Sequence, residues 1–257
     1  MGWRGVLMGI TLLIFWRLFQ FSNTENKISS IYSWQGIIVI FAFAINSVTF
    51  TLGIQETSVM VVLTAVATMP VFAAFLSVFL MNESQGWGGW LTIIASMVGV
   101  LIVVSDGNNA VGQPEGSTVL GAIYGCITAS GLALAFTMIR KYRELEVIPA
   151  AAIGSLISGI FGFLLSAEGS IFTAPVWTIL TMGVLILPVS FGLISIAPRY
   201  TTSAIVSLVM LLEMVIGPFW VWIAIGERPS ITMILGAFLV ITVISFHIIR
   251  TQFYLKE

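Results

Sequence analysis

Few side chains in this sequence could bind or change a ligand, and nearly all of them are uncharged. Glu213 is the only carboxylate deep inside a long apolar run. A charged side chain at the centre of a bilayer costs at least about 2.5 kcal/mol, so such residues usually face a cavity or a partner. Glu213 therefore has two interpretations: a counter-charge or proton site for a substrate, or a neutral acid hydrogen-bonded to a neighbouring helix.

Polar residues inside other apolar runs are the second candidate for chemistry. Asn46 and Thr49 share a helix face at i, i+3, and Tyr124 and Thr128 share one at i, i+4. Ser190 follows Asn46 by 144 residues. Together with the buried acid they predict a substrate-binding cavity. The alternative is that they only hydrogen-bond between helices, each bond contributing around 0.6 kcal/mol.

The sequence contains few residues that could support metal binding, catalysis or the binding of nucleic acid or phosphate. The chain has one histidine, His247, and one cysteine, Cys126, without metal-ligand spacing, so we predict no metal site, no cofactor and no enzymatic activity. A net charge of −1 without a dense basic cluster argues against nucleic acid. Since no Lys or Arg lies in the middle of a run, phosphate-bearing substrates are disfavoured. Neutral, zwitterionic or cationic solutes such as amino acids, amines or drug-like molecules are favoured instead.

The elements that must position these residues are long apolar helices. The chain is 58% hydrophobic and only 8% charged, whereas a soluble domain carries roughly a quarter charged residues. Its apolar runs match the ~20 residues that a helix needs to span a bilayer. The composition predicts an all-α integral membrane protein, a polytopic helical bundle of nine spans. The runs lie at about 5–20, 36–54, 58–81, 87–105, 117–139, 148–166, 176–197, 202–225 and 231–249.

Local composition adds two expectations about these helices. Pro70, Pro188 and Pro218 should interrupt helical hydrogen bonding and kink their spans. Small residues at four-residue spacing should let helices approach closely. The small residues are Gly121, Gly125 and Ala129 in one run, and Gly154, Ser158 and Gly162 in the next.

An offset of 144 residues indicates an internal repeat. Adding 144 to three runs of the first half, from about 36, 58 and 87, gives three runs of the second half. We predict two repeats, 1–106 with four spans and 117–250 with five. The repeat mate of the span at 117–139 would precede Met1. We therefore expect a missing first helix, through a truncated gene or a misplaced start codon, and a non-transporting remnant or membrane scaffold stays open as the alternative function.

Charges at the ends of the runs predict the orientation. With a cytoplasmic C-terminus, eight Lys and Arg residues lie inside and only Arg4 and Arg228 lie outside, as the positive-inside rule requires. The segment at 57–83 then starts outside and its copy at 201–227 starts inside, so the repeats are inverted. We predict a multi-pass protein of a cell membrane, of the bacterial inner-membrane kind.

The sequence resembles the EamA family of the drug/metabolite transporter superfamily. The resemblance rests on Thr57-Ser58, Met69-Pro70, Asn82-Glu83 and Gly226-Glu227. Met214 stands where the family's second-copy Glu-Pro motif places proline, and Asn82 replaces a usual glycine. The resemblance implies two inverted five-helix repeats, here five-plus-five less one helix, and a secondary transporter or exporter of small metabolites working by alternating access. It also implies a central site lined by the runs at 36–54, 58–81, 117–139, 176–197 and 202–225. The expected partners are a small-molecule solute and membrane lipid, and a homodimer is compatible with it.

Overall fold

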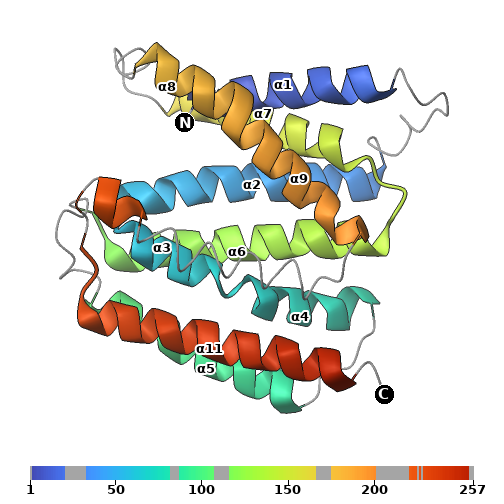
Figure 1. Ribbon diagram of the computed structural model, residues 1–257. Coiled ribbons are helices and arrows are strands. Elements are labelled where there is room, and N and C mark those ends of the chain that lie inside the picture. The colour runs from blue at the N-terminus through green and yellow to red at the C-terminus, as the bar shows by residue number, and fades with distance from the viewer. Residues whose placement is uncertain are drawn as a thin grey trace. The chain divides into compact units, whose positions relative to one another are not determined.

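The computed structural model describes residues 2–20, 33–81, 87–106, 116–165, 175–200, 220–224, 226 and 228–254. Almost all of them are helical, which confirms the predicted all-α class (Figure 1). Helices suit such apolar sequences because a helix bonds its backbone N–H and C=O groups internally. In chain order the helices are α1 (Gly2–Gln20), α2 (Trp34–Glu56), α3 (Val59–Val66), α4 (Met69–Met81), α5 (Trp87–Asp106), α6 (Thr118–Lys141), α7 (Val147–Leu164), α8 (Val176–Leu180), the π-helical segment η4 (Thr181–Ile186), α9 (Leu187–Tyr200) and α11 (Ile231–Tyr254).

Five helical stretches among the described residues are long and apolar enough to cross a membrane. They are Trp34–Glu56, Val59–Met81, Thr118–Lys141, Val147–Leu164 and Val176–Ala197, and they coincide with five of the predicted runs. Two shorter apolar stretches, Ile94–Asp106 and Ile231–His247, lie in α5 and α11. Only 220–224 of the predicted run at about 202–225 is described. The count of nine spans therefore stays a prediction.

The helices group into two compact units. The first comprises Met1–Val48 and Leu134–Thr201, and the second comprises Thr49–Ala133 and Thr202–Glu257. Both units draw on both halves of the sequence, and helices α2 and α6 each contribute to both. The predicted repeats, 1–106 and 117–250, describe a duplication of sequence rather than these spatial groups, and they stay a prediction.

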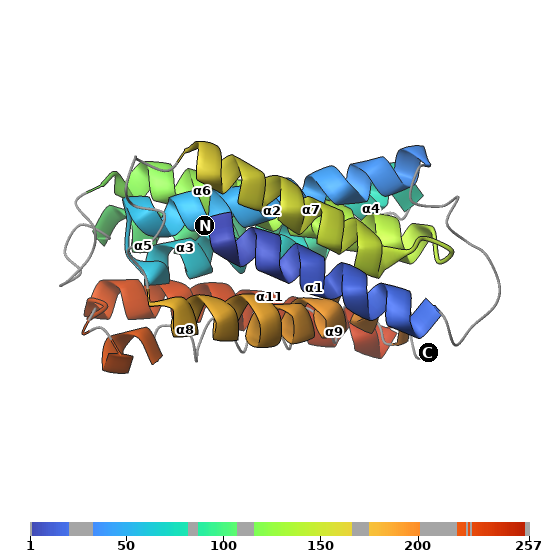
Figure 2. The ribbon, with the colours of Figure 1, turned by 90° about the horizontal axis from the view of Figure 1, so that it is seen from above.

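In the first unit, α1 and α7 lie side by side and antiparallel (Figures 1 and 2). Their backbones nearly touch: a Cβ atom on Gly5 would lie 2.7 Å from the Cα of Gly159. The opposite side of α7 meets α2, where a Cβ on Gly154 would lie 2.8 Å from the Ile40 carbonyl oxygen. Small residues thus let α7 pack closely on two sides, and Gly154 is one of the small residues predicted to allow a close approach.

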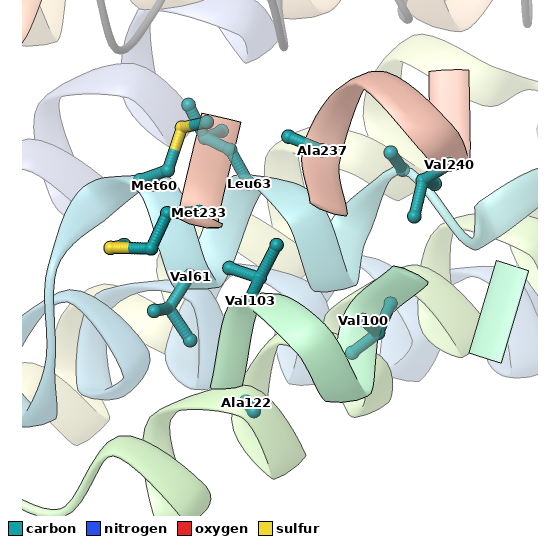
Figure 3. Close-up of a cluster of buried hydrophobic side chains, with 10 residues drawn as sticks. Met60, Val61, Leu63, Val100, Val103, Ala122, Met233, Ala237 and Val240 are labelled. Atoms are coloured by element: carbon teal, nitrogen blue, oxygen red, sulfur yellow. The ribbon is translucent and has the colours of Figure 1, made fainter. Parts of the chain in front are cut away.

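In the second unit, α5 and α11 form the corresponding close pair (Figure 1). They meet at Gly99 and Gly236. A Cβ atom added to either glycine would lie 3.0 Å from the carbonyl oxygen of the other. Beside this crossing lies a cluster of buried hydrophobic side chains from α3, α5, α6 and α11 (Figure 3). Its members are Met60, Val61, Leu63, Ala67, Val100, Val103, Ala122, Met233, Ala237 and Val240. The second unit therefore has an apolar core that fixes α3 against α5 and α11.

Candidate functional site

Two of the predicted cavity residues are in direct contact. The hydroxyl oxygens of Thr49 on α2 and Thr128 on α6 lie 2.7 Å apart, a hydrogen-bonding distance at which either can donate. Thr49 is 8% exposed and Thr128 is 1% exposed. A hydroxyl pair enclosed between two helices satisfies its own polar groups. The pair can hold α2 to α6.

The neighbouring predicted residues lie one turn away on the same helices. Asn46 precedes Thr49 on α2 and is 4% exposed. Tyr124 precedes Thr128 on α6 and is half-buried. Residues three or four positions apart share a helix face. Each helix therefore carries two predicted polar residues on one face. The hydroxyl contact joins the later residue of each pair, Thr49 and Thr128.

The last two predicted residues are not part of this arrangement as described. Ser190 lies on α9, follows the π-helical segment η4, and is exposed. Its repeat equivalent Asn46 is buried. Glu213 lies outside the described residues. Its role in a site stays a prediction.

Helices α3 and α4 are one apolar stretch interrupted at Ala67 and Thr68. Pro70 has no N–H, so the Val66 carbonyl loses its usual helical donor. The Val71 N–H donates to the Thr68 carbonyl at 2.9 Å rather than to the carbonyl four residues back. The Thr68 hydroxyl donates to the Ala65 carbonyl at 2.6 Å. The interruption predicted at Pro70 is confirmed, and it leaves backbone carbonyls without helical partners inside a span.

A buried hydroxyl that the sequence analysis did not single out lies on the helix that faces this interruption. Ser96 on α5 is 0% exposed, and its Oγ has no hydrogen-bond partner among the described residues. It lies one turn before Val100, which packs in the same cluster as Ala67, and α5 contacts both α3 and α4. Leaving a buried hydroxyl unpaired costs about 1–3 kcal/mol, so such a group is suited to meet a water or a solute. Ser195 on α9 is a second such hydroxyl.

Nothing in the sequence around Ser96 and Ser195 distinguishes them from the other serines and threonines of the apolar runs. Both lie in apolar runs that contain other Ser or Thr residues, such as Thr92 on α5, which donates to the Gly88 carbonyl of its own helix. Ser77 and Thr64, in the run at 58–81, also donate to carbonyls of their own helices. Only tertiary packing separates a hydroxyl that bonds back to its helix from one left enclosed.

Comparison with protein families decides what kind of molecule this is. The model of the EamA-like transporter family matches residues 1–105 and 119–249. The chain belongs to that family. Comparison with curated proteins gave no match. As a member of the EamA-like transporter family, the chain is a multi-pass membrane protein of the drug/metabolite transporter type. The family consists of transporters rather than enzymes. In the described part of the chain, no group of three or more His, Cys, Asp or Glu residues could hold a metal ion.

The motif that carries the EamA resemblance has a physical role in the fold. Ser58 is the N-cap of α3, and its Oγ accepts a hydrogen bond from the Val61 N–H at 3.4 Å. Thr57 donates from its hydroxyl to that of Thr118 at the start of α6, at 3.5 Å. Both residues are buried. The Thr-Ser pair thus starts one helix and joins it to another, on the unit that also holds the Thr49–Thr128 contact.

Proposed function

We propose that this EamA-family chain is a secondary transporter that moves small solutes across the cytoplasmic membrane by alternating access, with its C-terminus in the cytoplasm. The substrate class is neutral, zwitterionic or cationic: an amino acid, an amine or a drug-like molecule. Membership in the family supports the transport activity. The chemistry of the buried polar residues supports the substrate class.

One observation carries the substrate class. Every buried polar residue among those described is Asn, Ser or Thr. Such side chains donate and accept hydrogen bonds without charge. Phosphate-bearing substrates are recognised through Arg or Lys in most proteins, and the described buried set contains neither. An uncharged lining can hold an amino, hydroxyl or amide group without leaving a protein charge unpaired.

The interruption between α3 and α4 supports a moving part in the same protein. A membrane helix that is broken near its middle offers backbone carbonyls to a solute or ion, as transporter sites commonly do. It also provides a place where a span can bend without breaking further hydrogen bonds. Alternating access can make use of such a place.

Glu213 remains the only residue predicted to give the site a charge. In the proposed function it balances an amino-bearing substrate or exchanges a proton with the transport cycle. The Glu213→Gln variant keeps the shape of the side chain and its hydrogen bonding but removes ionisation.

The test is solute flux into liposomes that contain the purified protein. A panel of labelled amino acids, amines and cationic dyes is offered to the wild type, to Glu213→Gln, and to Glu168→Gln, which removes a carboxylate between predicted spans. We expect wild-type flux of at least one solute, retained in Glu168→Gln and lost or made independent of pH in Glu213→Gln. Normal flux and pH dependence in a folded Glu213→Gln protein would refute the role of this residue. A folded wild type that moves none of the panel would favour the membrane scaffold.

A further inference from the structure

We propose that one end of the first unit binds the headgroup of an anionic phospholipid. The surface consists of the last turn of α1 together with residues 140–146, which are the end of α6 and the turn that leads to α7, and we name it the basic end. It is distinct from the predicted solute residues. The proposal does not depend on the transported substrate.

A side-chain hydrogen bond brings the two parts of this surface together. The indole Nε1–H of Trp16 donates to a carboxylate oxygen of Glu146 at 3.3 Å. Glu146 is the N-cap residue of α7 and makes no side-chain hydrogen bond to that helix. The contact continues the antiparallel packing that Gly5 and Gly159 establish further along. The end of α1 is thereby fixed beside the start of α7, and both views place it at the same end of the unit as the α6–α7 turn (Figures 1 and 2).

Four cationic side chains gather on the basic end. Arg17 follows Trp16 on α1, and Arg140, Lys141 and Arg143 lie at the end of α6 and in the turn; all four are exposed. The same stretches hold two acidic residues, Glu144 and Glu146, which leaves a net charge of +2. The planar guanidinium forks of arginine match the oxygens of a phosphate group. The charge and the donor geometry therefore fit an anionic phosphate ester.

The surroundings of these cations favour a lipid over a soluble phosphate. Next to Arg17 on α1, Ile14, Phe15 and Leu18 are 55%, 45% and 65% exposed. On the α6–α7 side, the Lys141 ammonium lies 5.4 Å from the centre of the Tyr142 ring. Aromatic and basic residues beside apolar helix surface are typical of the boundary between headgroups and acyl chains. A phospholipid can place its phosphate on the cations and its acyl chains along the exposed side of α1.

The predicted orientation places this surface at the cytoplasmic leaflet. Anionic lipids attract basic segments near the membrane surface, and the attraction grows with each Lys or Arg. A bound headgroup would join α1, α6 and α7 at one point. The lipid would thus reinforce the place where the Trp16–Glu146 hydrogen bond joins α1 to α7.

The test measures which lipids the purified protein retains. The protein in neutral detergent is mixed with equal amounts of phosphatidylglycerol and phosphatidylcholine of the same acyl chains, and retained lipid is identified by native mass spectrometry. We expect the wild type to retain phosphatidylglycerol preferentially. The Arg17→Gln/Arg140→Gln/Arg143→Gln protein should lose that preference by about tenfold or more. The Arg228→Gln/Arg250→Gln/Lys256→Gln protein loses as many charges elsewhere and should keep the preference.

Further arms distinguish the sources of the effect. Trp16→Phe keeps every charge but removes the hydrogen bond to Glu146, and we expect an intermediate loss of preference because the end of α1 is no longer fixed beside the start of α7. This single variant also serves if the triple variant does not fold. An equal loss in the two triple variants would overturn the proposal in favour of net charge alone. Displacement of the lipid by an equal concentration of inorganic phosphate, or by an acidic peptide, would overturn it in favour of a soluble phosphate or a protein partner.

Discussion

The α1–α7 pair and the α2–α6 contact hold helices together in different ways. In the first unit, α1 and α7 meet through glycines whose backbones nearly touch, as at Gly5 and Gly159. In the second unit, α2 and α6 meet through the hydroxyl pair of Thr49 and Thr128. Backbone contact between helices cannot be exchanged for water or a solute, whereas a hydroxyl pair can. The closest backbone approaches of α1 and α7 are between small residues, whereas the contact between the two predicted solute residues Thr49 and Thr128 is polar.

The largest effect is expected from filling the glycine contact. Gly159→Leu would push a side chain against the backbone at Gly5 and Val6, whose atoms lie within 2.9 Å of the position of its Cβ. Overpacking against backbone that cannot move aside should cost about 3 kcal/mol or more. Thermal unfolding in detergent measures the loss.

A matched glycine and a second close pair show whether this effect is specific. A Cβ at Gly192 would meet only a side-chain methyl of Leu12, at 3.7 Å, so Gly192→Ala should leave stability unchanged or raise it. Gly99→Leu, in the α5–α11 pair, should cost less than Gly159→Leu, because part of what blocks it is the side chain of Val240. The reverse order would show that α5–α11 is the more rigid pair.

An intermediate effect is expected where a polar contact reinforces an apolar pair. Ser230 accepts a hydrogen bond from the Met233 N–H at 3.1 Å at the start of α11, and its hydroxyl donates to Asp106 at the end of α5. Ser230→Ala removes both and should destabilise the protein by about 1 kcal/mol, the usual cost of a lost N-cap. Ser105→Ala removes an exposed hydroxyl that bonds only within its own helix and should have little effect. Equal changes in melting temperature for the two variants would contradict this assignment.

The smallest effect on stability is expected at the hydroxyl pair. In a double-mutant cycle of Thr49→Val and Thr128→Val, the coupling energy should be about 0.6 kcal/mol, the average for such bonds in membrane proteins. Liposome flux sharpens the result. If the pair also lines the solute path, each valine variant should lose flux out of proportion to its stability. Unaltered flux in both would leave the pair with a purely structural role.

Much of the fold could be predicted from the sequence because apolar length and small-residue spacing act locally. The helix of α6, its glycines and the interruption at Pro70 all follow from residues close together in the chain. Gly5 and Gly9 of α1 have the same four-residue spacing but were not singled out, and only the structure shows their partners, such as Leu156 and Gly159, which lie about 150 residues away. The same distance hides the Trp16–Glu146 contact. Trp16 near the end of an apolar run and Glu146 in a charged turn are both ordinary residues for their positions, so neither indicates a contact.

The candidate site was predictable only in part, for a related reason. Polar residues in apolar runs identify which helices could meet a solute. The contact of Thr49 with Thr128 is compatible both with a cavity and with hydrogen bonding between helices alone. The sequence does not show which hydroxyls bond back to their own helix. Ser96 and Thr92 therefore look alike in the sequence, although Thr92 donates to the Gly88 carbonyl and Ser96 is enclosed without a partner among the described residues.

The π-helical segment between α8 and α9 changes how the two halves of the sequence should be aligned. Its wider turn at Thr181–Ile186 holds more residues than a turn of α-helix. Each additional residue rotates the side chains that follow by about 100° around the helix axis. At the predicted offset of 144 residues, Asn46 is buried and Ser190 is exposed. A π-helical segment in one of two such halves can therefore place predicted equivalent residues in different surroundings.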